Sequence, residues 1–240
     1  MTTDGKTGDR RARVRQETLA EIRATARKLL VAKGPAAVTV NAVAREMGVS
    51  GPALYRYFTG HDQLADELTA DFYRDLTAAV EAARDSVGAD TSDRRLLAMS
   101  RALRAWAVGN PAEFGWIFTR VAMPAAERAG APSMLAGEDF ERVLRDEFVR
   151  LWRTRPFAVP DLDRLAPSLR EQLGAYSEGI GGALPPAAAH VFLTSWIRLY
   201  GLLCMEVLHQ LDFVFTDVEP LFEEALREIC DRLGVVYEPA

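Results

Sequence analysis

Residues 39 to 58 carry the spacing that a helix-turn-helix requires, and this segment constrains the fold more than any other. Two short helices can cross closely only where the residue at the crossing is small, and Ala44 meets that condition. Four residues later, Gly48 permits a left-handed backbone conformation without a Cβ penalty. Three apolar side chains are expected to seal the helix pair from inside: Val43, Val49 and Leu54. The motif makes DNA binding the leading functional interpretation.

The second helix of the motif is expected to begin at Ser50. The Ser50 hydroxyl is placed to accept a hydrogen bond from a backbone N–H of the first helical turn, as N-cap side chains do. Pro52 lies in that first turn, where its missing N–H would have had no partner. The helix therefore starts directly after the turn at Gly48.

The stretch from Val49 to Phe58, followed by Gly60 to Leu64, resembles the DNA-binding domain of the TetR family of transcriptional regulators. About twenty positions fit in order without a gap, far more than a short motif offers. In that family the second helix enters the major groove. The resemblance implies that the first residues of this helix let the backbone approach the bases, and that Ala53 meets a thymine methyl. The predicted DNA-binding residues are Thr39, Asn41, Ser50, Gly51, Pro52, Ala53, Tyr55, Arg56, Tyr57 and His61.

The resemblance also assigns individual roles at the edges of the motif. Thr39 would cap the first helix and touch a phosphate, Asn41 occupies a position from which some relatives read a base, and the tyrosines would reach phosphates or base edges. His61 stands where the family usually has Lys. Because imidazole is charged only below neutral pH, we hypothesise that operator affinity weakens as the pH rises through neutrality. Binding that is independent of pH between about 6 and 8 would contradict this hypothesis.

The charge distribution favours DNA binding over the alternative, an amphipathic hairpin packed in a larger helical core. Residues 1 to 57 contain 11 Lys and Arg and 5 Asp and Glu, a net charge of +6, whereas residues 58 to 240 have a net charge of −11. One basic end on an acidic chain attracts phosphate without indiscriminate binding. Four arginines precede the first helix: Arg10, Arg11, Arg13 and Arg15. They could lie in a minor groove or form a solvated tail.

Length and composition indicate a cytoplasmic protein of two unequal domains. We expect a basic flexible arm at residues 1–13, a DNA-binding headpiece at residues 14–59 and a helical domain for effector binding and dimerisation at residues 60–240. No signal peptide or membrane span is expected. Cys204 and Cys230 match no metal or redox spacing and are interpreted as reduced core or interface residues.

The chain is predicted to be all-α, because nearly every long segment has helical periodicity. Residues 14 to 33 place Leu19, Ile22 and Leu29 on one face, and Gly34-Pro35 ends that helix. A long helix follows Thr59. Further helices are expected at residues 91–109, 111–122, 137–154, 162–179, 186–211 and 217–233, separated by proline-rich and glycine-rich loops.

The helix from His190 to Leu211 is apolar nearly all round, so it must be buried on both sides. A second copy of the chain would cover one side, together with the amphipathic helix that follows. The resemblance implies an Ω-shaped homodimer joined through its last two helices; a hairpin inside a monomer is the alternative. The predicted interface residues are Phe192, Leu199, Leu203, Leu221, Leu226 and Ile229. A dimer places its recognition helices roughly 34 Å apart, so the operator should be an inverted repeat.

Two aromatic stretches, Trp106 to Phe114 and Trp196 to Gly201, resemble the WHG-type subgroup of the family's C-terminal domains, although Tyr200 stands where that subgroup usually has His. The resemblance implies a cavity for a small apolar or aromatic effector among residues 60 to 180. A solid domain that answers to a protein partner, or to nothing, is the alternative. The predicted lining residues are Trp106, Phe114, Ile117, Phe118, Phe148, Trp152, Tyr176, Trp196 and Tyr200.

An enzyme is the competing functional class, and the sequence offers little for it. The three histidines, His61, His190 and His209, form no metal-binding spacing, and no phosphate loop or nucleophile elbow is present. We therefore expect no cofactor, no metal and no catalytic residue. Repression is the commoner activity in the family that the chain resembles, and a repressor released from operator DNA by its effector is the resulting expectation.

Overall fold

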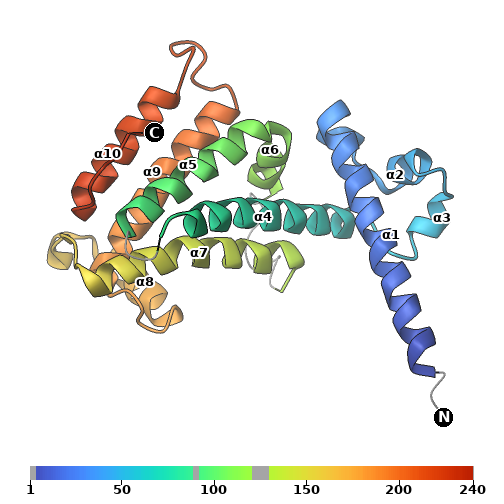
Figure 1. Ribbon diagram of the computed structural model, residues 1–240, viewed down its shortest axis with the longest axis horizontal. Coiled ribbons are helices and arrows are strands. Elements are labelled where there is room, and N and C mark those ends of the chain that lie inside the picture. The colour runs from blue at the N-terminus through green and yellow to red at the C-terminus, as the bar shows by residue number, and fades with distance from the viewer. Residues whose placement is uncertain (1–3, 89–91, 121–129, 240) are drawn as a thin grey trace. The chain divides into compact units, whose positions relative to one another are not determined.

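A computed structural model describes residues 4–88, 92–120 and 130–239. The described residues contain helices and no β-strand, which confirms the all-α prediction. Figure 1 shows the helices, which are α1 (Asp4–Lys33), η1 (Pro35–Ala37), α2 (Val40–Glu46), α3 (Gly51–Leu54), α4 (His61–Ser86), α5 (Ser92–Gly109), α6 (Pro111–Arg120), α7 (Pro132–Thr154), η3 (Leu162–Arg164), α8 (Pro167–Gly179), α9 (Pro186–Val207) and α10 (Glu219–Leu233).

The chain divides into two compact units whose boundary differs from the one expected at residue 59. Unit 1 comprises residues 1–74 and 112–137, and unit 2 comprises residues 75–111 and 138–240. Helix α4 contributes its first half to unit 1 because it runs without interruption from His61 to Ser86. Helix α6 also belongs to unit 1. The DNA-binding headpiece therefore packs against a helix that lies more than 50 residues further along the sequence.

Helix α1 begins at Asp4, so residues 4–13 form its first turns and not the flexible arm expected from the sequence. Residues 10 to 33 contain neither glycine nor proline and consist largely of arginine, alanine, leucine and other good helix formers. Among the side chains of α1 that the structure describes, Arg10 and residues 12–33, the buried apolar face lies in the second half of the helix and includes Ile22, Ala26 and Leu30. The helix ends at Lys33, and Gly34 follows with φ +79°.

Unit 1 joins α6 to the headpiece through polar contacts. Arg27 of α1 donates from Nε to Oε1 of Glu113 at 2.8 Å, and the Glu113 side chain is only 6 % exposed. Trp116 donates from Nε1 to Oγ1 of Thr69 in α4 at 3.0 Å. Phe114 and Ile117 of α6 are each 1 % exposed. Helix α6 is therefore part of the core that supports the headpiece.

Unit 2 is organised around α9, which packs against α5, α8 and α10. Its apolar composition is explained mainly by burial within the same chain: Leu203 is fully buried and Phe192 is 2 % exposed. By length and mean hydropathy α9 could span a membrane, which the sequence analysis did not anticipate, but 44 % of its most apolar stretch is buried, and the core helix of a soluble protein meets the same criteria.

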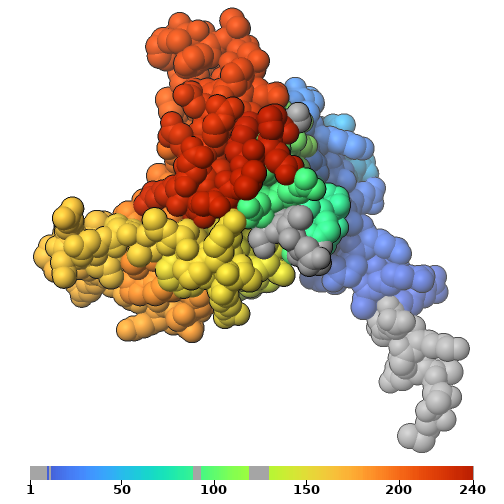
Figure 2. Space-filling view, turned by 60° about the vertical axis from the view of Figure 1, so that its left-hand side comes forward, coloured from blue at the N-terminus to red at the C-terminus, as the bar shows by residue number. Residues whose placement is uncertain are grey.

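Five of the six predicted interface residues point into the core of unit 2 instead. Phe192, Leu199, Leu203, Leu226 and Ile229 are all less than 9 % exposed in the single chain, and Leu221 is half-buried. These side chains are covered because α5 and α10 pack on the same face of α9 that the sequence pattern assigned to a second copy. Figure 2 shows α10 and the segment between α9 and α10 at the surface, and Phe213 of that segment is 84 % exposed.

Candidate DNA-binding surface and effector cavity

The segment from Thr39 to Leu54 forms the two crossed helices that its spacing predicts. Thr39 caps α2 by accepting a hydrogen bond from the backbone N–H of Ala42 at 3.1 Å. Gly48 has φ +71°, so the turn uses the left-handed conformation that glycine permits. Ala44 is 2 % exposed where α2 and α3 pack together. These observations confirm the helix-turn-helix.

Two local expectations about this motif are wrong. Val49 does not seal the helix pair, because it lies in the turn and is 41 % exposed. Ser50 takes the N-cap position of α3, but its hydroxyl makes no capping hydrogen bond. The reason is the position of Pro52: it is the second residue of the helix, where it removes one N–H that the cap would bind. The next N–H, of Ala53, bonds to the backbone oxygen of Ser50 at 3.0 Å.

Helix α3 covers only Gly51–Leu54, so Tyr55, Arg56 and Tyr57 lie in the turns that follow it. Tyr57 is half-buried, and the guanidinium carbon of Arg15 in α1 lies 5.5 Å from the centre of its ring. Tyr55 is 49 % exposed. Phe58, by contrast, is 1 % exposed and anchors the end of the motif in the core of unit 1.

The predicted DNA-binding residues are exposed or half-buried, and two of them are in close contact. These residues are Thr39, Asn41, Ser50, Gly51, Pro52, Ala53, Tyr55, Arg56, Tyr57 and His61. A Cβ added at Gly51 would lie 2.8 Å from Oδ1 of Asn41. Because glycine has no Cβ, the first residue of α3 leaves room for the Asn41 side chain. Asn41 on α2 and Gly51 on α3 thus share one surface, which polar groups and bare backbone make suitable for contact with base edges and phosphates.

His61 is the first residue of α4, and its ring Nδ1 lies 3.5 Å from the carboxylate of Asp62. The start of this helix is also fixed by Gln63, whose side-chain oxygen accepts from the backbone N–H of Thr59 at 2.7 Å. The imidazole itself is about half exposed, as a phosphate contact requires.

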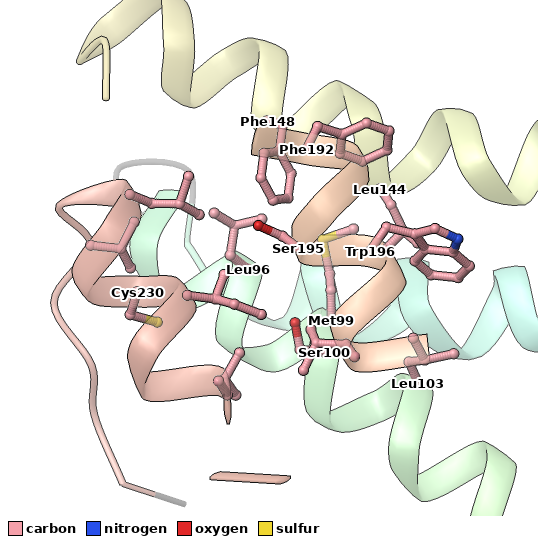
Figure 3. A pocket seen from close by; sticks show the side chains of 15 residues that line it. Leu96, Met99, Ser100, Leu103, Leu144, Phe148, Phe192, Ser195, Trp196 and Cys230 are labelled. Atoms are coloured by element: carbon pink, nitrogen blue, oxygen red, sulfur yellow. The ribbon is translucent and has the colours of Figure 1, made fainter. Parts of the chain in front are cut away.

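A small apolar cavity of about 50 Å³ lies within unit 2, between α5, α7, α9 and α10. Figure 3 shows side chains from all four helices pointing toward it. Apolar groups dominate the lining, and two hydroxyls, from Ser100 and Ser195, interrupt it. The lining residues are Leu96, Met99, Ser100, Leu103, Leu144, Phe148, Phe192, Ser195, Trp196, Leu199, Leu226, Ile229, Cys230, Leu233 and Val235.

The lining of the cavity carries no ionisable carboxylate or amine. Ser195 donates its hydroxyl proton to the backbone oxygen of Val191 at 2.8 Å, so its oxygen can still accept a hydrogen bond from a ligand. Burial raises the pKa of the Cys230 thiol to about 11, so the sulfur lines the cavity as a neutral group at physiological pH. The cavity therefore suits an uncharged, mostly hydrocarbon molecule.

Of the nine lining residues predicted from the sequence, the structure places two at this cavity: Phe148 and Trp196. Phe114 and Ile117 belong to the core of unit 1, and Phe118 is 41 % exposed. The remaining four are half-buried around the cavity helices without lining it: Trp106, Trp152, Tyr176 and Tyr200. Tyr200 stacks on Trp196 with ring centres 4.7 Å apart, and Tyr176 donates to Glu141 at 2.5 Å.

The sequence reasoning missed α5, which lines the cavity with Leu96, Met99 and Leu103. Their spacing of three and four residues was a signal for a buried helix face, but it does not say whether that face meets a cavity or another side chain. In the described part of the chain, no group of three or more His, Cys, Asp or Glu residues is arranged to hold a metal ion.

Two family profiles match the sequence. The profile described as bacterial regulatory proteins of the tetR family matches residues 22–68, and the profile described as the tetracyclin repressor-like C-terminal domain matches residues 96–229. The HTH-type transcriptional regulator Rv1816 of Mycobacterium tuberculosis is 32 % identical over 138 residues, which cover 56 % of this chain and 59 % of that protein. The matched part thus spans less than two thirds of this relative.

Solved structures have the same fold over most of the chain. The candidate regulatory protein SCO4313 superposes with a TM-score of 0.68 and 30 % identity, covering 92 % of this chain and 98 % of that one. RolR, crystallised with its ligand resorcinol, superposes with a TM-score of 0.59 at 14 % identity, covering 95 % of this chain and 97 % of that one, a likeness that concerns the fold alone. With a helix-turn-helix in place and family profiles matching both its N-terminal part and more than half of its length, the chain belongs to the TetR family of helix-turn-helix transcriptional regulators.

Proposed function

We propose that this regulator is a homodimeric repressor that acts in the cytoplasm, binds an inverted-repeat operator and leaves it when a small apolar molecule occupies the cavity in unit 2. The observation that carries the DNA-binding part is the joint surface of α2 and α3, where the exposed Asn41 lies against Gly51. A single such surface covers too few base pairs for specificity, and two copies related by a two-fold axis read two half-sites about one helical turn apart.

The exposed face of α9 supports the dimer part of the proposal. Ile197 is 66 % exposed and Met205 is 41 % exposed, and Gly201 lies between them in the sequence with an exposed backbone. An ion pair between Arg198 and Glu228 of α10 lies at the rim of this face. Apolar groups inside a polar rim are typical of an interface between subunits.

Sedimentation of the DNA-free protein tests the dimer directly. We expect a dimer at micromolar concentration and a monomer after Ile197→Glu, because a charge would be buried without a partner at the two-fold axis. The control is Val31→Glu, which changes an apolar residue of α1 that is 59 % exposed. A wild-type protein that sediments as a monomer contradicts the proposal.

The cavity supports the effector part and also limits it. An engineered cavity of about 150 Å³ binds benzene, whereas this cavity measures about 50 Å³. An aromatic ring therefore fits only if lining side chains change rotamer, and Met99 is unbranched and adaptable. A ligand that moves α5 and α10 on entry would bind the two states of the protein differently, which is the condition for coupling to DNA binding.

Thermal unfolding with indole and with benzene tests the cavity. We expect both probes to raise the midpoint of the wild-type protein, and neither to raise that of Ser100→Leu, whose larger side chain fills the space. The small volume supports a second candidate, a regulator with no small-molecule ligand. That candidate predicts no shift with either probe and operator binding that neither probe changes.

Selection of bound fragments from random DNA tests the operator. We expect an enriched inverted repeat with half-site centres about 10 base pairs apart. Enrichment of a single half-site contradicts the dimeric reading, and failure to enrich any sequence contradicts specific DNA binding. Placing the enriched site between a promoter and a reporter then distinguishes repression from activation.

A further inference from the structure

The first turns of α1 carry an arginine segment, residues 10–16, that lies outside the matched part of the family. The match to the family's DNA-binding profile begins at residue 22, and α1 begins at Asp4. The arginine segment contains Arg10, Arg11, Arg13 and Arg15 and no acidic residue. It therefore extends the headpiece by a strongly cationic piece of helix.

Packing against the described residues of unit 1 does not account for the side chains of this segment that the structure describes. The side chains from Ala12 to Glu17 are all exposed, and the largest apolar group among them, Val14, is 48 % exposed. A helix that is polar all round gains no stability from a buried face. A partner that neutralises arginines would stabilise it, and a polyanion has the required chemistry.

The contact between Arg15 and Tyr57 links the arginine segment to the DNA-binding surface. The guanidinium carbon of Arg15 lies 5.5 Å from the centre of the Tyr57 ring. Stacking uses the flat face of the guanidinium and leaves the N–H groups at its edge available for a phosphate. Among the described residues, no carboxylate forms a salt bridge with Arg15, whereas Arg13 lies 3.6 Å from Glu17.

The helical form of the segment decides which part of DNA it can meet. A helix with its side chains is about 10–12 Å wide, and the minor groove is about 6 Å wide, so the helix cannot enter it. The inference rests on the proposed function, in which α3 occupies the major groove at the half-site. The remaining targets are the phosphates of the backbone beside that groove.

We propose that the arginine segment is a second DNA-contact element, which binds backbone phosphates flanking the half-site, with Arg15 held in position by Tyr57. Its contribution is independent of base sequence, because phosphates carry no sequence information. It lengthens the DNA that each headpiece covers beyond the α2–α3 surface.

Salt dependence of binding tests this proposal. Each phosphate neutralised adds about 0.9 to the slope of log affinity against log salt concentration, so raising salt from 50 to 200 mM weakens binding about 3.5-fold per contact. We expect Arg15→Ala to lose one such contact per headpiece, and to weaken binding to the operator and to an unrelated duplex by the same factor. The matched control is Lys33→Ala, which removes one exposed positive charge at the other end of α1.

Equal salt slopes for wild type and Arg15→Ala would overturn the proposal, and so would a loss confined to the operator. Val14→Pro separates the helical segment from an extended arm: it breaks the helix, so we expect binding to weaken, and unchanged binding would overturn the helical contact. Circular dichroism checks that the rest of the headpiece remains folded. If the wild-type protein binds no DNA at all, DNA binding itself fails, an outcome distinct from failure of the arginine segment.

Discussion

The helix-turn-helix in unit 1 and the cavity in unit 2 differ in how far apart in sequence their parts lie. The proposed DNA-binding surface lies on residues 39 to 61, one continuous segment. Its spacing correctly predicted the left-handed turn at Gly48, the close helix crossing at Ala44 and the cap at Thr39. The cavity is assembled from α5, α7, α9 and α10 and the segment after α10, over nearly 140 residues from Leu96 to Val235. The sequence predicted the helix-turn-helix because its parts are close together in the chain. It did not predict the cavity lining, because that depends on which helices pack against one another.

The same contrast applies to apolar residues. In the headpiece, a small residue at the crossing and a glycine at the turn have specific steric reasons to be there. In unit 2, an apolar residue on α9 can face the core, the cavity or a second copy with equal chemical suitability. Helical spacing identifies a buried face, and only the packing partner gives that face a role.

The largest expected effect tests whether α9 is core or interface. Leu203→Ala removes a fully buried side chain and should lower the free energy of unfolding by about 3–4 kcal/mol. Ile197→Ala, on the exposed face of the same helix, should change it by less than about 0.5 kcal/mol in the monomer. Denaturant unfolding measures both. Similar effects for the two variants in the monomer would mean that the chain itself buries both faces of α9.

The second effect tests how far the headpiece depends on α6. Arg27→Met leaves the buried Glu113 carboxylate without its 2.8 Å hydrogen bond and should destabilise unit 1 by about 3 kcal/mol. Arg74→Met, which removes an exposed partner of Asp71, should have an effect under about 1 kcal/mol. Urea unfolding followed by circular dichroism reports the difference. If the two variants are equally stable, the headpiece does not rely on α6.

The third effect concerns DNA binding without a change in stability. Gly51→Ala brings a Cβ to 2.8 Å from Oδ1 of Asn41, so the Asn41 side chain must turn away. Loss of one base contact would lower operator affinity about tenfold. Thermal unfolding should be nearly unchanged, because the flexible end of one exposed side chain can move. Fluorescence anisotropy with a labelled operator measures the affinity, and unaltered affinity would remove Asn41 from the contact surface.

The smallest effect compares a histidine in each unit. Burial, assisted by the charge of Arg232, lowers the pKa of His190 below its ordinary value of 6.5. The unfolded chain therefore binds a proton more readily, so stability falls as the pH drops below about 6.5. We expect His190→Gln to flatten unfolding stability between about pH 5 and 7 without changing the pH dependence of operator binding.

His61→Gln should do the reverse, because His61 lies at the start of α4 beside the DNA-binding surface. The expected change is loss of the pH dependence of operator binding between about pH 6 and 8. If the two variants exchange these behaviours, the assignment of one histidine to DNA and the other to the fold is wrong.

Particular residues show where sequence reasoning reached its limit. Helix boundaries such as Ser92–Gly109 and Pro186–Val207 were predicted closely at one or both ends, because proline, glycine and capping residues act locally. Ser50 does not cap α3 with its side chain, because Pro52 in the first turn has no N–H for the Ser50 hydroxyl to accept. Phe114 and Ile117 failed as cavity residues because α6 joins unit 1, a pairing that no local signal reports.

The sequence by itself determined the helical class, the crossed pair of helices at residues 39 to 58 and the family, because each depends on the order of residue types over short distances. The tertiary structure decided the rest: that the arginine segment is helical and places Arg15 over the Tyr57 ring, that α6 supports the headpiece, and that most of α9 is covered by its own chain. Those outcomes depend on contacts between residues distant in sequence. An apolar or charged face has no preferred partner until the chain is folded.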